Sequence, residues 1–162
     1  MQYTETAPHP ALAGYIDAYW TATGNAAHTV VEKILPDGCV DIIMNAGADC
    51  YTDNGTVLMK HEKAYLVGTM TRSKETAMDK NTRLIGVRFK PGAVTAFFGK
   101  MPLQELVNKT VELDAFLAID TCQLLASPAT WLDDWLYKKF KGPDERLLSQ
   151  VRSIQQSKGQ VT

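Results

Sequence analysis

Two charged side chains interrupt strands that are otherwise apolar, and they are the clearest candidates for chemistry in this sequence. Asp41 lies in the run 39–44, which is apolar on both strand faces, and Arg88 lies in the run 84–89. A buried carboxylate without a partner is costly, and its pKa rises until it becomes neutral. We therefore expect Asp41 and Arg88 to face the interior within salt-bridge or one-water distance. An ion pair between strands, a polar contact in a ligand pocket and exposure at an edge all remain open.

Aromatic side chains supply the apolar wall that a small-molecule site needs. Arg88 shares its strand face with Gly86, where another group can approach the backbone closely. Aromatic residues are also the main constituents of ordinary cores, so a plain core is the competing interpretation. The residues of the candidate pocket are Tyr15, Tyr19, Trp20, Cys39, Asp41, Tyr65 and Arg88.

The residues that usually carry catalysis or bind metal lack the necessary spacing. The three histidines, His9, His28 and His61, are scattered and form no H-x-H pair. The glycines form neither a dinucleotide-binding fingerprint nor a phosphate-binding loop. The three cysteines have no nearby base, and their odd number is typical of reduced thiols in a cytoplasmic protein. We therefore expect no enzyme, no metal and no cofactor.

Length and charge narrow the class of protein further. The chain has 162 residues, enough for one full domain, and a net charge of −1. It has 17 basic residues against 18 acidic ones, so it offers no excess of positive charge for nucleic acid. The first ten residues do not resemble a signal peptide, and no apolar run approaches a membrane span.

Alternating and β-branched patterns predict short strands over the first ninety residues. A tight turn is expected at Pro36-Asp37-Gly38 and a hairpin turn at Asp53-Asn54-Gly55. Strands followed by helices indicate an α+β arrangement, with a sandwich or small barrel over about residues 15–90. The expected strands are 15–23, 29–35, 39–46, 56–59, 64–70, 74–78 and 83–90.

After Pro91 the apolar period becomes helical. Ser127-Pro128 is a good start for a helix, and Pro143 opens a second one. The first of these helices carries a large apolar stripe, which predicts either packing within the chain or a homodimer face. The candidate interface residues are Trp131, Leu132, Trp135, Leu136 and Phe140.

Three segments, taken together and in this order, resemble a known family. They are ILPDGCVDIIMN at 34–45, YLVGTMT at 65–71 and GVRFKPGAVTAFFG at 86–99. The opening Pro10–Trp20 and the PLQEL segment at 102–106 continue the pattern. The pattern is similar to the N-terminal sensor region of AraC/XylS-family transcription regulators, in a subfamily whose N-terminal part is an uncharacterised domain. Residues 146–162 resemble the first helix of that family's DNA-binding region.

The resemblance implies a cupin-like β-barrel that holds an unknown small-molecule effector, followed by helices that dimerise. It assigns residues 1–115 to sensing, 116–142 to linker and dimerisation helices, and 143–162 to the start of a helix-turn-helix region. We expect a fragment of a longer regulator, with sequence-specific DNA binding only through the missing C-terminal part. Two alternatives remain: an interaction-only dimerisation module with a filled barrel, and a metal-free cupin-type enzyme.

Overall fold

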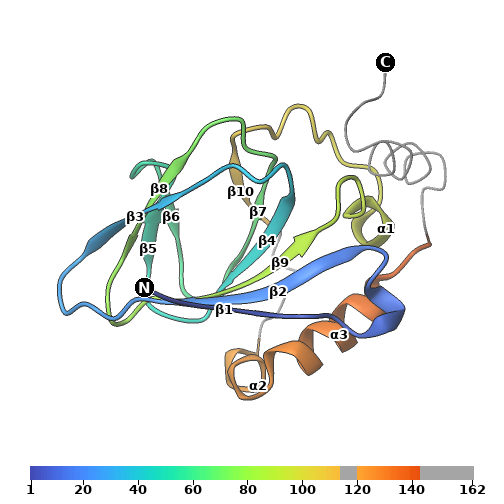
Figure 1. Cartoon of the computed structure of the whole chain (residues 1–162), viewed down its shortest axis with the longest axis horizontal. Helices are drawn as coiled ribbons and strands as arrows, with labels where there is room; N and C mark the ends of the chain where they lie inside the picture. The colour runs from blue at the N-terminus through green and yellow to red at the C-terminus, as the bar shows by residue number, and fades with distance from the viewer. Residues whose placement is uncertain (114–119, 143–162) are drawn as a thin grey trace.

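The computed structural model describes residues 1–113 and 120–142. Within these ranges the chain is mostly β-structure, with a few short helices towards the C-terminus (Figure 1). No helix in the described part of the chain is long and apolar enough to cross a membrane. The strands are β1 (Gln2–Thr6), β2 (Ile16–Thr23), β3 (Val30–Ile34), β4 (Val40–Asn45), β5 (Cys50–Thr52), β6 (Val57–Met59), β7 (Ala64–Val67), β8 (Lys74–Met78), β9 (Arg83–Phe89) and β10 (Thr110–Glu112).

Six strands form one antiparallel sheet in the order β1-β2-β9-β4-β7-β10. Strand β9 lies between β2 and β4, so that Gly86 is opposite Trp20 on one side and opposite Ile43 on the other. A β-bulge interrupts the pairing of β2 with β9 between Ile16 and Ala18. Because a bulge adds one residue to a strand, it changes which face the residues before it occupy.

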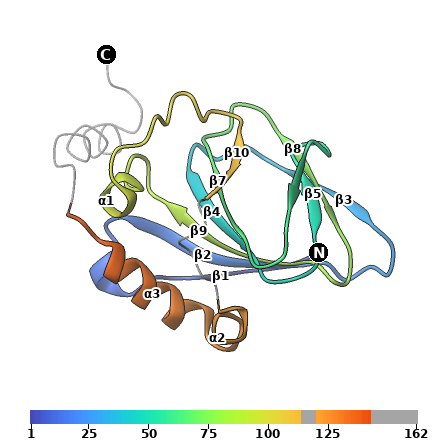
Figure 2. The same ribbon diagram turned by 180° about the vertical axis from the view of Figure 1, so that it is seen from behind.

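Two smaller sheets, β3-β8 and β5-β6, lie over one face of the large sheet (Figures 1 and 2). The turn that joins β5 to β6 contains Asp53, Asn54 and Gly55, all with positive φ. Aspartate, asparagine and glycine are the residues that tolerate this region, which explains the turn. Gly38 also has a positive φ of 74°, as the turn before β4 requires.

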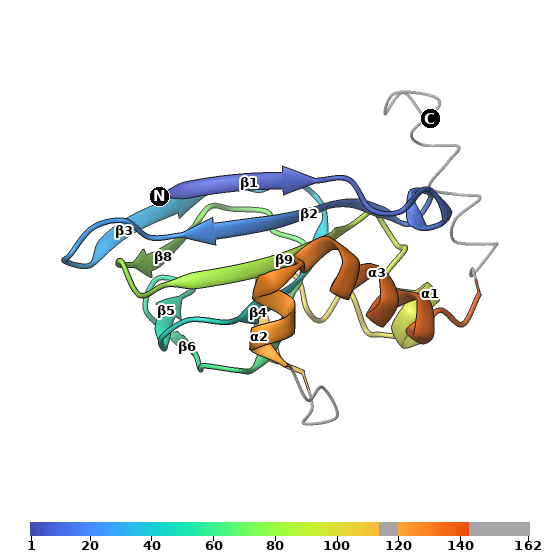
Figure 3. The same cartoon turned by 90° about the horizontal axis from the view of Figure 1, so that it is seen from below.

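The helices cover the other face of the large sheet (Figure 3). They are α1 (Thr95–Phe98), α2 (Thr121–Ala126) and α3 (Pro128–Lys139), and a 3₁₀ turn spans Pro10–Leu12. Helix α3 starts at Pro128, whose fixed φ suits a first helical position. It ends with two lysines, where cations interact favourably with the helix dipole.

Successive residues of the central strands enter different cores. Tyr19, Ile85 and Val87 pack in the core beneath the helices, together with Leu132 and Leu136. The residues next to them in the strands enter a second core under the small sheets, whose buried members include Trp20, Ala22, Met59, Tyr65, Met78 and Leu84. The alternation of a β-strand thus divides the molecule into two apolar layers, one on each side of the large sheet.

The predicted fold class, short strands followed by helices, is confirmed. All seven predicted strands are present, with ends that differ by a few residues. Strands β1, β5 and β10 were missed, because two are three residues long and β1 is exposed at every position. The predicted segment 143–162 lies outside the described residues, and so does 114–119, which covers the end of the predicted sensing domain and the start of the predicted linker.

The five residues of the predicted interface stripe on α3 fall into two groups, one buried within the chain and one partly exposed. Leu132 and Leu136 are fully buried within the chain, so the prediction that they form a dimer face is wrong. They fill the core beneath the large sheet instead. Trp131 and Trp135 stack on each other and are half-buried, and Phe140 is 37% exposed. These three residues remain available to a partner.

Candidate functional site

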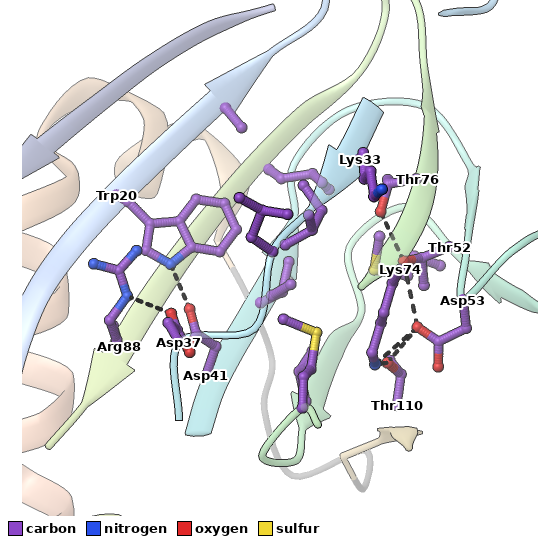
Figure 4. A pocket seen from close by; sticks show the side chains of 18 of the residues that line it. Trp20, Lys33, Asp37, Asp41, Thr52, Asp53, Lys74, Thr76, Arg88 and Thr110 are labelled. Atoms are coloured by element: carbon purple, nitrogen blue, oxygen red, sulfur yellow. Dashed lines mark hydrogen bonds and ion pairs between the residues drawn. The ribbon is translucent and has the colours of Figure 1, made fainter. Parts of the chain in front are cut away.

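A cavity of about 320 Å³ lies between the large sheet and the two small sheets. Its floor is formed by side chains of β2, β9 and β4, and β3, β5, β6 and β8 line its other walls (Figure 4). The middle of the cavity is apolar, and polar groups stand at two ends. The apolar lining includes Ala22, Ile34, Ile43, Met59, Val67, Met70, Met78 and Leu84.

The first polar end is built around Trp20. Its indole Nε1 donates a 2.7 Å hydrogen bond to Asp41 Oδ2. The indole lies directly over Gly86, where a Cβ atom would overlap the ring. Tyr3 stacks on the indole, with ring centroids 6.0 Å apart. Glycine at position 86 is therefore what allows the indole to lie flat on β9 and reach Asp41 on β4.

Burial sets the protonation of Asp41. Desolvation raises the pKa of its carboxyl to about 7, although the hydrogen bond from Trp20 lowers it. The nearby Asp37 raises the pKa further, and the charge of Arg88 lowers it. Asp41 therefore changes charge near neutral pH, which is unusual for an aspartate.

Arg88 is opposite Asp41 in the pairing of β4 with β9, yet it forms ion pairs with other carboxylates. Its guanidinium lies 2.9 Å from Glu5, 3.4 Å from Asp17 and 3.2 Å from Asp37. It also donates a 2.8 Å hydrogen bond to the Tyr3 hydroxyl. Burial opposes the charge of Arg88, but the hydrogen bonds to Glu5 and Tyr3 raise its pKa above the ordinary value.

Asp41 and Arg88 were expected within salt-bridge or one-water distance. Arg88 forms its salt bridges with other carboxylates instead, and contact with Asp41 through one water stays a prediction. The two residues do face the same side of the sheet, as expected, because they are partners in register. The indole of Trp20 takes the position of hydrogen-bond donor to Asp41, and strand β1 and the 36–38 turn bring acidic side chains to Arg88. Arg88 Nε is buried and has no hydrogen-bond partner, since its 3.2 Å approach to Asp37 lacks hydrogen-bond geometry.

The second polar end is a buried ion pair. Lys74 Nζ lies 3.0 Å from Asp53 Oδ1, and the two side chains are only 8% and 12% exposed. Thr110 accepts a 3.1 Å hydrogen bond from Lys74 and donates one of 2.9 Å to Asp53. The hydroxyls of Thr52 and Thr76 are 2.8 Å apart beside this group. Lys33 lines the cavity on the same side (Figure 4).

Four of the seven predicted pocket residues line the cavity: Trp20, Cys39, Asp41 and Arg88. Cys39 stays a neutral thiol there, because burial and the nearby Asp37 raise its pKa to about 11. Tyr65 packs in the core next to the cavity, and its hydroxyl accepts a 2.7 Å hydrogen bond from the Lys60 amide. It is not among the residues that line the cavity.

Tyr15 and Tyr19 do not belong to the pocket, which corrects the prediction. Tyr19 faces the helices and donates a 2.7 Å hydrogen bond to Asp133 of α3. Burial and this bond raise its pKa above the ordinary value. Tyr15 packs edge-on against Phe97 and Phe140 on the same side of the sheet. Both tyrosines connect the sheet to the helical layer.

Sequence reasoning missed Tyr3, Asp37, Asp53, Lys74 and Thr110, all of which line the cavity. Only Lys74 could have been recognised among these five residues, because it is the first residue of a predicted strand. A lysine buried in a strand needs an acidic partner, so an ion pair could have been expected there. The others come from β1, β10 and turns, where no periodic pattern indicates which side chains point inward.

Among residues 1–113 and 120–142, no three histidine, cysteine, aspartate or glutamate side chains are grouped to hold a metal ion. The cavity thus combines an apolar middle, a carboxyl that titrates near neutral pH and a buried ion pair. An apolar lining with a few directed polar groups is the usual composition of small-molecule sites in proteins.

The described chain is therefore a β-sheet protein with helices on one face of its main sheet and a cavity on the other. It belongs to the family described as a domain of unknown function (DUF6597), whose model matches residues 4–112. The matched range runs from the middle of β1 to the last residue of β10, and so includes all of the strands from β2 to β10.

None of the curated proteins compared matches the sequence. Among solved structures, the chain is similar to ethanolamine utilization protein Q from Salmonella typhimurium LT2. The two share 10% sequence identity and align with a TM-score of 0.36, over 54% of this chain and 67% of the other.

Proposed function

We propose that this domain senses a small molecule, which it binds in the cavity, and that it controls the DNA-binding part of an AraC-type transcription regulator. The cavity carries this proposal. Its volume of about 320 Å³ is at the lower end of the range for ligand pockets, ~300–1,000 Å³. An interaction-only module with a filled interior would lack such a space. The cupin-like barrel form is part of the same proposal.

The resemblance to the regulators supports the location of the sensor. The segments 34–45, 65–71 and 86–99 contain strand β4, all of β7 except its first residue, and the C-terminal part of β9. These strands are neighbours at the centre of the large sheet, and β9 and β4 carry Arg88 and Asp41. Two of the three strands that form the floor of the cavity, β9 and β4, thus lie in segments that resemble the family.

Strand β2 offers a route from the cavity to the helices. Trp20 faces the cavity, and its neighbour Tyr19 faces α3 and donates a hydrogen bond to Asp133. A ligand that displaces the indole from Gly86 moves β2, and with it the hydroxyl that holds α3. Such a ligand changes the population of helix positions only to the extent that it binds one arrangement more tightly.

Ligand binding is tested with a substitution that fills the cavity with a larger side chain. Ile43→Trp places a large ring in the cavity, and Val31→Trp makes the same kind of change on β3, where Val31 is 57% exposed. A small-molecule library is screened by thermal shift, and hits are measured by calorimetry. Binding to the original chain and to Val31→Trp, but not to a folded Ile43→Trp, supports the proposal. Equal binding to all three proteins contradicts it.

The regulatory part is tested on DNA. The native gene product is incubated with its own promoter region, with and without a hit from the screen, and analysed by gel shift in titrated salt. A change in specific retention on adding the ligand is expected, and it should be absent with Ile43→Trp. Specific binding that ignores every cavity ligand would contradict regulation through this site.

A further inference from the structure

We infer that the cavity selects ligands that carry a protonated amine, which binds beside Asp41, and an apolar body that fills the middle of the cavity. This inference rests on the proposed function, because it names the class of molecule that the same cavity takes. Four observations support it: three concern the end of the cavity at Trp20, and the fourth concerns its apolar middle (Figure 4).

The first observation is the balance of charge. Arg88 is in ion-pair distance of Glu5, Asp17 and Asp37, and Asp41 lies opposite it in the sheet. Four carboxyl groups therefore surround one guanidinium, and negative charge is in excess when they are ionised. The other cationic side chains that line the cavity, Lys33 and Lys74, stand at its far end.

The second observation is that the carboxylate of Asp41 can accept more hydrogen bonds than the protein supplies. Its Oδ2 accepts the hydrogen bond from Trp20, and no group within residues 1–113 and 120–142 donates to Oδ1. Asp41 lies deep in the protein, but it keeps some accessible surface because it faces the cavity. An ionised carboxylate can accept several hydrogen bonds, so this one can take a donor from a ligand.

The third observation is that the hydrogen bonds and ion pairs of Arg88 already go to protein groups, which disfavours an anionic ligand there. Its Nη1 and Nη2 atoms donate to Glu5, Asp17 and Tyr3, on the side of β1 and β2. Its remaining nitrogen, Nε, has no hydrogen-bond partner, but it is buried and lies 3.2 Å from the carboxylate of Asp37. Asp37 and Asp41 line the same end of the cavity, and their charges would repel an incoming carboxylate or phosphate.

The fourth observation is the chemistry of the rest of the cavity. The walls between its two ends are aliphatic and thioether side chains: Ile34, Ile43, Met59, Met70, Met78 and Leu84. They favour an apolar body, since burial of apolar surface drives such binding. A primary ammonium attached to a compact hydrocarbon matches both parts, whereas a sugar or a nucleotide matches neither.

Ammonium binding also has a defined pH dependence. Burial holds the pKa of Asp41 at about 7, so raising the pH from 6 to 8 converts most of this carboxyl to the charged form. An alkylamine stays protonated over this range, because its pKa is close to that of lysine, about 10.4. Affinity for the amine should rise up to about tenfold between these two pH values.

The test uses three probes of similar shape: phenethylamine, 2-phenylethanol and 3-phenylpropionate. Binding to the complete chain is measured by calorimetry and by NMR at pH 6 and pH 8. The amine is expected to bind at least tenfold more tightly than the alcohol at pH 8, with the carboxylate weakest. Asp41→Asn, which keeps an acceptor for Trp20, should abolish the preference and its pH dependence. Glu75→Gln, which removes an exposed charge on β8, should leave both unchanged.

The outcomes separate this inference from the proposed function. If the alcohol or the carboxylate binds as tightly as the amine, and Ile43→Trp blocks that binding, the cavity is a ligand site but the amine preference is refuted. If no probe and no library compound binds, both are refuted. An amine preference that survives in a folded Asp41→Asn would also refute the role given to this carboxyl.

Discussion

Trp20 and Asp41 are joined across an intervening strand: the indole of β2 passes over Gly86 of β9 and donates to the carboxyl of β4 at 2.7 Å. This contact covers the width of three strands, and both of its residues line one end of the cavity. It also explains why Asp41 and Arg88, although opposite each other in the sheet, are not a direct ion pair. Arg88 is directed instead towards Glu5 and Asp17.

We predict that Asp41 makes the folded state less stable as the pH rises. Burial raises its pKa to about 7, above the value of about 3.9 in an unfolded chain. The folded protein therefore holds a proton that the unfolded chain releases. The resulting stability is fully present below about pH 4 and is lost as the pH rises through 7. It amounts to about 4 kcal/mol at ~1.4 kcal/mol per pKa unit.

The measurement is urea unfolding between pH 4 and pH 8, of the original chain and of Asp41→Asn. The difference between the two proteins isolates Asp41 from carboxyls that act in the opposite direction, such as Glu5, whose pKa is lowered by its bonds to Tyr3 and Arg88. The variant should gain stability relative to the original chain as the pH rises. Parallel pH profiles would show that Asp41 titrates normally.

We predict that Gly86→Ala displaces the indole of Trp20. A Cβ atom at this position would overlap the ring. Overpacking of this kind typically costs about 1–3 kcal/mol, and here it also breaks the bond to Asp41. The free energy of unfolding and the tryptophan fluorescence should both change. Gly14→Ala is the matched control, because a Cβ there would have no atom within 4 Å. Equal effects of the two substitutions would contradict the packing described.

Much of the fold could be predicted from the sequence, because β-branched residues and alternating apolar positions identify a strand within a short stretch of sequence. The turns at Gly38 and at 53–55 were also predictable, since their residue types are those that tolerate positive φ. Strand β1 could not be predicted from the sequence, because every residue in it is exposed and the strand is defined only by its pairing with β2. Short strands such as β10 depend in the same way on a partner far along the chain.

The candidate site was only partly predictable, and alternation explains one of the errors. Tyr19 and Trp20 are neighbours in a strand, so they cannot both face one cavity. Choosing between them required knowing which face the helices cover. The correct partners of Arg88 come from β1, β2 and a turn, and such non-local contacts leave no pattern in the sequence.

A homodimer through α3 remains a prediction, now restricted to a smaller surface. Leu132 and Leu136 are buried within the chain, so Trp131, Trp135 and Phe140 are the candidates left. Sedimentation at micromolar concentration should give twice the 17.9 kDa mass of the chain. Trp131→Glu should shift the protein towards the monomer, because burying a charge at an apolar contact is costly. Glu75→Gln should have no effect, and a purely monomeric original chain would contradict the prediction.

We predict that losing Lys74 alone destabilises the protein strongly, and that replacing Lys74 and Asp53 together by uncharged residues does so much less. Lys74→Met leaves the Asp53 carboxylate without its cation at a site where it is only 12% exposed. Removing one partner of a buried ion pair costs about 3–5 kcal/mol, which chemical denaturation would show as a large loss of stability. The double variant Lys74→Met/Asp53→Asn should recover most of this loss, because asparagine still accepts from Thr110 and tolerates the positive φ of 52° at this position. Full recovery is not expected, since Lys74 also donates to Thr110.

Two outcomes would contradict this prediction. One is a single variant as stable as the original chain, and the other is a double variant no more stable than the single one. Either would show that the pair does not hold β8 to the β5–β6 turn in this way.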